Sequence, residues 1–138
     1  MEKPELENKT AIVLEKDLLS WQKLNVAAFL ASAIAKRFPE TMGEDFVDAS
    51  GISYPGIFRV PVVIFAAEAA DLRRVYERAK ARELVVGIYT RKIFETQGDQ
   101  NLEAVASSSE AEHDLVGLVF YGPKNKVNKA VDGLKLHA

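Results

Sequence analysis

Apolar residues along this chain fall into short continuous runs that alternate with stretches of helical spacing. The short runs predict four β-strands, at residues 10–15, 57–66, 84–89 and 115–121. The stretches of helical spacing predict three α-helices, at residues 20–37, 68–83 and 124–134. Their order predicts one α/β domain over residues 1–138, a three-layer sandwich with a mixed four-stranded sheet and helices on both faces.

The residues within these segments refine the prediction. The helix at 20–37 is rich in alanine and apolar on nearly every face, so we expect burial on more than one side. Ser20 is its expected N-cap. The uniformly apolar run at 84–89 favours a central strand. Pro61 cannot donate a ladder hydrogen bond, so its strand is expected at a sheet edge or with a bulge.

Three segments lack either pattern. Residues 1–8 are charged and are expected to form a flexible N-terminus. Residues 39–55 are expected to be irregular, because they are rich in turn-forming residues. Residues 91–114 form a long polar and acidic excursion, which we expect to be exposed and mobile, with a helical turn at its start.

Composition is typical of a soluble globular protein and removes several classes of function. Of the 138 residues, 48% are hydrophobic, and no apolar run reaches the roughly 18–20 residues that span a bilayer. The first residues contain no apolar signal core, so a cytoplasmic location without membrane contact is expected. The absence of cysteine excludes disulfides and thiol nucleophiles. Since no zinc spacing or phosphate-binding glycine pattern is present, we expect neither a metal nor another cofactor.

Charge bears on the partners of the protein. The net charge of −2 argues against a dedicated nucleic-acid-binding protein, so tRNA is not a favoured partner. Residues 73–92 nevertheless hold seven basic side chains, whereas 93–114 hold six acidic ones and no Lys or Arg. Such a basic run is typical of a solvated face, and the alternative is a face that meets an anionic ligand or partner.

Candidate functional residues follow the ends of two predicted strands, the first and the third. If these strands are parallel neighbours, their carboxyl ends meet beside the amino end of the first helix, where open α/β folds usually hold ligands. The candidate catalytic residues are then Asp17, Asn25, Thr90 and Thr96. The candidate ligand-binding residues are Ser20, Trp21, Asn25, Tyr54, Thr90 and Arg91.

Several candidates also have a purely structural interpretation. Asp17 would cap the local turn, Asn25 would make a structural hydrogen bond, and Thr90 would simply end its strand. Trp21 would pack over the strand end rather than line a pocket. Tyr54 would be a surface turn residue rather than a flap over the site. The sequence leaves both interpretations open.

Two stretches resemble a known family: KTAIVLEKDL…LNVAAFLASA near the start and GLVFYGPKNKVNKAVDGLKLH at the end. They are similar to the two ends of the type-II peptidyl-tRNA hydrolases, which begin with a strand, a DL turn and a GKxAAQxxHA helix. Those enzymes end with a strand, Gly-Pro, an amphipathic helix and LKL. The sequence is most similar to an uncharacterised, divergent branch of that superfamily, the domain of unknown function 2000. The resemblance implies a peptidyl-tRNA hydrolase II-like fold over nearly the whole chain.

The chain departs from the hydrolases at the residues expected to act on substrate. Leu24 and Asn25 stand at the family's Gly-Lys, so its lysine is absent. The family's DAGRTQ loop corresponds to the segment that begins at Thr90 and ends at the glutamine after Thr96. Thr90 replaces the family's aspartate, whereas Thr96 and the following glutamine match its Thr-Gln. The family's glutamine and histidine are replaced by Phe29 and Ser32.

Three functions are compatible with these residues. The leading hypothesis is a domain that binds a small polar or anionic ligand at the carboxyl edge of the first and third strands. The second is residual hydrolysis of peptidyl-tRNA or a related ester, by an enzyme without the usual lysine. The third is a non-enzymatic homodimer formed through the helix that contains residues 73–82 or through an edge strand. Whether the protein is an enzyme stays open.

Overall fold

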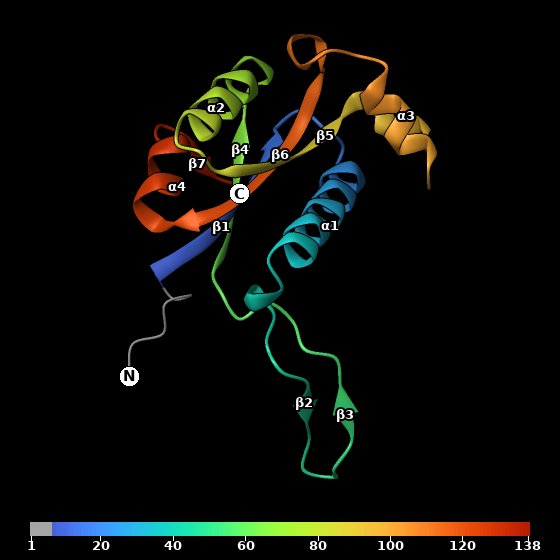
Figure 1. The fold of residues 1–138 in the computed structure, drawn as a ribbon, viewed down its shortest axis with the longest axis vertical. Helices are drawn as coiled ribbons and strands as arrows, with labels where there is room; N and C mark the ends of the chain where they lie inside the picture. The colour runs from blue at the N-terminus through green and yellow to red at the C-terminus, as the bar shows by residue number, and fades with distance from the viewer. Residues whose placement is uncertain (1–6) are drawn as a thin grey trace.

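A computed structural model describes residues 7–138 of the chain (Figure 1). The strands of its main sheet are β1 (Asn8–Glu15), β4 (Val62–Ala67), β5 (Val85–Thr90), β6 (Leu115–Pro123) and β7 (Lys135–Leu136). Their order across the sheet is β5-β6-β1-β4-β7. β1 pairs parallel with β4 and antiparallel with β6, so the sheet is mixed. β5 and β7 form its edges.

Helices cover both faces of the sheet, which gives three layers (Figure 1). α1 (Ser20–Arg37) covers one face, and α2 (Ala69–Ala81) with α4 (Lys124–Ala130) covers the other. The remaining helical segments are α3 (Gln100–Ala106), η2 (Pro39–Thr41), η3 (Arg91–Glu95) and η4 (Glu110–Glu112). The predicted α/β class is confirmed.

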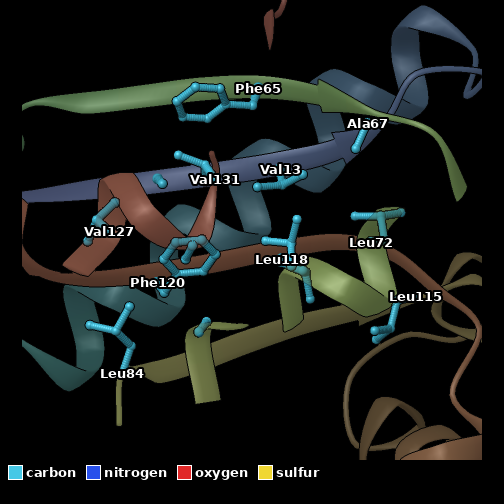
Figure 2. Close-up of a cluster of buried hydrophobic side chains, with 14 residues drawn as sticks. Val13, Phe65, Ala67, Leu72, Leu84, Leu115, Leu118, Phe120, Val127 and Val131 are labelled. Carbon is cyan, nitrogen blue, oxygen red and sulfur yellow. The ribbon is translucent and has the colours of Figure 1, made fainter. Parts of the chain in front are cut away.

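A hydrophobic core lies on each face of the sheet. Figure 2 shows the core on the α2 and α4 side, where Leu118 of β6 lies toward Leu72 of α2, and Phe120 lies beside Val127 and Val131. The second core joins Ile12 of β1 to Val26 of α1. Successive residues of a central strand point to opposite faces of the sheet and pack in different cores. This explains why the sequences of these strands are apolar at nearly every position.

The predicted number of strands was one too few, and one strand was misplaced. The last predicted helix ends early, at Ala130, and a turn at Gly133 (φ 89°) leads into β7. β5 was expected to be central but lies at the edge of the sheet. Its apolar sequence has another cause, since α1 and α2 cover its two faces: Gly87 lies against Ala33 of α1, and Ile88 packs against the α2-side core.

α1 has the predicted bounds but is buried on one side only. Val26 and Leu30 face the sheet and are at most 2% exposed, whereas Leu24 is 74% exposed. Ser20 is the first helical residue rather than the N-cap. The backbone N–H of Leu19, just before it, donates to the Gln22 side chain at 3.0 Å.

Residues 42–58 form a hairpin that projects beyond the carboxyl end of α1, and we call it the hairpin arm (Figure 1). It contains β2 (Phe46–Val47) and β3 (Ser53–Tyr54), which pair antiparallel. At its tip, the Asp48 carboxylate accepts hydrogen bonds from two backbone N–H groups and, at 2.6 Å, from the Tyr54 hydroxyl. Two short strands therefore lie in a segment that was predicted to be irregular.

The predicted excursion at 91–114 contains η3, α3 and η4, and its last part folds back on α2. The Glu110 carboxylate accepts hydrogen bonds from the Tyr76 hydroxyl and from Lys80, both at 2.5 Å. Arg73 donates to the carbonyl oxygen of His113 at 3.0 Å. The acidic excursion thus meets the basic helix of the same chain.

All seven basic residues of 73–92 contact groups of this chain: Arg73, Arg74, Arg78, Lys80, Arg82, Arg91 and Lys92. The basic side chains of residues 73–92 therefore make contacts within the chain. The expected flexible N-terminus at 1–8 lies mostly outside the described residues, and β1 begins within it, at Asn8. Along residues 7–138, no helix combines the length and the apolar character needed to cross a bilayer.

Candidate functional site

The carboxyl ends of β1, β4 and β5 share one edge of the sheet, which we call the carboxyl edge. The predicted neighbours at this edge are wrong, because β6 lies between β1 and β5. β6 runs antiparallel to both, so its first residue, Leu115, pairs with Thr90 at the end of β5. The parallel neighbour of β1 is β4. Sequence order could not give this arrangement, because the strand inserted between β1 and β5 comes later in the chain.

Ion pairs nevertheless link the ends of β1 and β5 across β6. The Arg91 guanidinium donates to the Glu15 carboxylate at 2.7 Å and to the Asp114 carboxylate at 2.9 Å. The hydrogen bond to Asp114, and then that to Glu15, raises the pKa of Arg91, so the guanidinium stays charged. Glu15 is only 6% exposed. Two carboxylates around one guanidinium give this group a net negative charge, which disfavours an anion there.

Thr90 is buried beside this ion-pair group. It is 3% exposed, and its hydroxyl has no hydrogen-bond partner among the described residues. The pairing shifts register here, since Tyr89 pairs with Gly117 but Thr90 with Leu115. Leu115 belongs to the core on the α2 side, so its partner Thr90 lies on that face of the sheet. Bulges of this kind often border functional sites.

An aromatic cluster lies at the same edge, on the α1 face of the sheet. Trp21 packs edge-on against Phe94, with ring centroids 6.3 Å apart, and Phe94 meets Tyr89 at 5.2 Å. Tyr89 in turn stacks on Phe29 at 6.0 Å. Burial raises the pKa of the Tyr89 hydroxyl. Trp21 remains 58% exposed at the rim of the cluster.

Three other candidates lie near the start of α1 and are exposed. Asp17 lies in the turn after β1, and Ser20 and Asn25 lie in the first turns of the helix. The structural interpretation of Asn25 required a hydrogen bond, but the side chain is exposed on α1. It therefore needs no structural hydrogen bond.

Two candidates lie elsewhere. The Thr96 hydroxyl donates to Asn101 in α3, at 2.5 Å. Tyr54 lies in the hairpin arm, beyond the carboxyl end of α1, whereas Ser20 begins that helix (Figure 1). The 18 residues of α1 separate the two by about 27 Å. Tyr54 therefore does not cover the carboxyl edge of its own chain.

The carboxyl edge contains a second region, between β1 and β4. The segments that leave these two strands go to opposite faces of the sheet, β1 into α1 and β4 into α2. In open α/β sheets, such a divergence opens a crevice in which ligands bind. A hollow of about 300 Å³ lies close to this point, at the carboxyl end of β4 and beside the amino end of α2, bordered by Lys16, Glu68, Asp71 and the turn at residues 133–135. We call it the β1–β4 crevice.

Charged groups surround the β1–β4 crevice. Lys16 pairs with Glu68 at 2.7 Å, and the hydrogen bond to Glu68 raises the pKa of Lys16. Asp71 pairs with Arg74. Within residues 7–138, Lys135 has no carboxylate at ion-pair distance. The amino end of α2 adds backbone N–H groups that have no partner within the helix and carry a partial positive charge.

Residues 8–138 match the model of one protein family, described as a protein of unknown function, DUF2000. The chain belongs to the DUF2000 family. A solved protein of unknown function from Agrobacterium tumefaciens strain C58 is similar to it, with 33% sequence identity and a TM-score of 0.90. That alignment covers 96% of this chain and 98% of the other. No curated protein matches the sequence.

Membership of DUF2000 confirms the resemblance to the uncharacterised branch, and the link to the hydrolases stays a prediction. Sequence reasoning overlooked Lys16, Glu68 and Lys135 of this DUF2000 chain as site residues. A charged residue directly after each of two strands was a usable signal for the first two. Across residues 7–138, no three His, Cys, Asp or Glu side chains are grouped so that they could hold a metal ion.

Proposed function

We propose that this DUF2000 domain binds a small anionic ligand in the β1–β4 crevice. The observation that carries the proposal is a hollow of about 300 Å³ at the carboxyl end of β4, bordered by Lys16, the amino end of α2 and the turn before β7. That volume is at the lower end of the range for ligand pockets, so it suits a small molecule. This location replaces the predicted one between β1 and β5, where β6 fills the gap.

The surrounding charge supports an anion over a cation. Lys16, Arg74 and Lys135 supply three positive charges near the crevice, against Glu68 and Asp71. The amino end of α2 adds its partial positive charge. Lys135 would hold the ligand directly, since no carboxylate of residues 7–138 competes for its ammonium. Lys16 would share its ammonium between Glu68 and the ligand.

A titration of the full chain followed by NMR tests this proposal. Inorganic phosphate, succinate and a nucleoside monophosphate serve as anionic probes. At least one of them should shift the amide signals of residues 66–71 and 133–135, because these border the crevice. Lys135→Glu should weaken binding about tenfold or more, since it replaces an attraction by a repulsion. Lys129→Glu, on the exposed side of α4, is the matched control and should leave binding unchanged.

Two results would contradict the proposal. One is a set of signals that no probe shifts at millimolar concentration. The other is a set of shifts centred on Thr90 and Arg91, which would favour the ion-pair group instead of the crevice.

We further infer a wider kinship with the type-II peptidyl-tRNA hydrolases. The two terminal motifs support it, and so does the order of the elements between them. Hydrolysis itself is disfavoured, because Asn25 replaces the family's lysine. A lost charge near a developing oxyanion typically costs about 2–4 kcal/mol, or roughly 10²–10³ in rate. A turnover assay with peptidyl-tRNA should therefore give the rate of buffer alone, and turnover above that rate would restore the hydrolase hypothesis.

A further inference from the structure

We propose that two copies of this chain form a dimer in which the hairpin arm of each protomer lies on the outer side of α1 of the other. The distribution of exposed apolar surface, the charge and the dimensions of these two elements support this dimer. It does not depend on the crevice, which lies at the carboxyl edge of the sheet.

Exposed apolar surface is concentrated on these two elements. Of the thirteen large apolar side chains that are exposed among residues 7–138, nine belong to the arm or to the start and outer side of α1. Those of the arm are Phe46, Val47, Ile52, Tyr54 and Ile57, and those of α1 and the residue before it are Leu19, Trp21, Leu24 and Phe29. Large exposed apolar side chains that gather on two elements of a folded chain are typical of interaction sites.

The arm is built as a hairpin although it has no core of its own. Besides the hydrogen bonds at its tip, the N–H of Gly43 donates to the carbonyl of Ile57 at 2.7 Å, and Met42 bridges to Phe58. Figure 1 shows that the arm extends away from the rest of the fold. An isolated two-stranded hairpin is only marginally stable in water. Apolar contact with another surface would give the arm the buried apolar area that it lacks.

Charge favours α1 as that surface. Between Gly43 and Phe58 the arm contains three acidic residues, Glu44, Asp45 and Asp48, and no basic residue. α1 contains three basic residues, Lys23, Lys36 and Arg37, and no acidic one. The basic residues lie along the flanks of α1, where they border β1, β4 and β5, rather than on its outer side. The arm is still opposite in charge to the helix that would receive it, and opposite charge aligns partners and speeds their encounter. Since both surfaces belong to one chain, a second copy supplies each with its complement.

Dimensions agree with this pairing. α1 is about 27 Å long, and seven residues of extended strand from Gly43 toward the tip span roughly 23 Å. The base of the arm lies beside the carboxyl half of its own α1, but the rest of the arm points beyond the end of that helix and can lie along another (Figure 1). Two-fold symmetry then makes both contacts at once.

The available area suffices for a stable dimer. The nine side chains are 46–74% exposed, which amounts to on the order of 1,000 Å² per protomer. A standard interface buries about 800 Å² per partner. A hollow of about 310 Å³ lies beside the outer side of α1, bordered by Ala28, Ala31, Ser32, Ala35, Met42 and Ile57. Its small side chains leave room for a large apolar residue of the partner's arm.

The mass in solution gives the first test. Light scattering of the wild-type chain should give twice 15.3 kDa at micromolar concentrations. The arm variant Phe46→Ser with Ile52→Ser, and the helix variant Leu24→Gln with Ala28→Gln, should each raise the dissociation constant about 30-fold or more. These residues are exposed, so circular dichroism should show an intact fold. Leu102→Gln, an equally exposed leucine on α3, should have no effect.

Mixing the two double variants tests the reciprocal geometry. Each variant alone forms a dimer with two impaired contacts. A mixed dimer has one intact arm-on-helix contact and one that carries both sets of substitutions. Because a contact that is already broken has little more to lose, an equal mixture should contain more dimer than either variant alone. A monomeric wild-type chain would overturn the proposal, and so would a dimer that survives both double variants. A mixture that behaves as the average of its components would overturn the reciprocal arrangement.

Discussion

At the scale of single residues, the carboxyl edge is organised around one buried charge. Glu15 ends β1 with a carboxylate that is almost fully covered, and its counter-charge comes from Arg91, more than seventy positions later in the chain. A buried carboxylate without a partner is costly, so this ion pair is a constraint on where the two strands end.

Removal of the guanidinium should therefore destabilise the fold. We expect Arg91→Met to lower the free energy of unfolding by about 1–3 kcal/mol, a range reduced from that for fully buried pairs because Arg91 is 47% exposed. Arg74→Met, which breaks a more exposed pair with Asp71, should cost no more than about 0.5 kcal/mol. Urea unfolding measures both, and equal losses would contradict a special role for Arg91.

A second residue-scale feature is the close approach of α1 to β6. A Cβ atom added at Gly117 would lie 2.7 Å from a methyl group of Val26 and 3.0 Å from one of Leu30. We expect Gly117→Ala to cost about 1–3 kcal/mol through overpacking. Val26→Ala removes the obstructing methyl groups, so the double variant should lose less than the sum of the two single losses. Additive losses in thermal or urea unfolding would argue against this contact.

At the scale of elements, α2 binds the acidic excursion of its own chain. The hydrogen bonds from Lys80, and next from Tyr76, lower the pKa of Glu110. A lowered carboxyl pKa means that the contact is complete above the ordinary value of about 4.3 and is lost as the pH falls through the lowered value. Acid should thus release this part of the excursion from α2.

Hydrogen exchange can detect that release. Glu110→Gln removes the charge at neutral pH, so we expect faster exchange of the amides of residues 107–113 in the variant than in the wild type. Below the lowered pKa the wild type should exchange as fast as the variant, because its own Glu110 is then neutral. The matched substitution Glu112→Gln, which leaves Lys80 and Tyr76 paired, should spare the contact with α2. Equal exchange at neutral pH would show that Arg73 alone holds the segment.

At the scale of the whole molecule, a net charge of −2 hides a separation of charge between the hairpin arm and α1. The arm is acidic and the helix basic, and both are apolar as well. The proposed dimer would bring these opposite surfaces together, whereas a monomer leaves both in water.

The dimer should accordingly respond to salt. We expect its dissociation constant to rise several-fold between about 50 and 500 mM NaCl, because the Debye length shrinks and the attraction between arm and helix is screened. Lys36→Gln should reduce this salt dependence, whereas Lys129→Gln on α4 should not. Sedimentation at several salt concentrations measures the effect. A dimer that tightens with salt would indicate a purely apolar contact.

Much of the fold was predictable because local patterns report local structure. α1 has its predicted bounds. The candidate site was only partly predictable. Thr90 and Arg91 do lie at the carboxyl edge, but Tyr54 lies in the arm, and the hollow lies beside Lys16 and Glu68, which were not among the candidates.

The sequence alone determined the α/β class, the bounds of α1 and the acidic excursion, because periodicity, charge and turn residues act within a few positions of the chain. Only the tertiary structure decided which strands are neighbours. β6 reaches its place between β1 and β5 through backbone pairing, and backbone hydrogen bonds are the same for every apolar strand. The tertiary structure likewise decided that the outer side of α1 is exposed. The sequence of an apolar helix does not show which of its sides will be buried, because that depends on where the other elements pack.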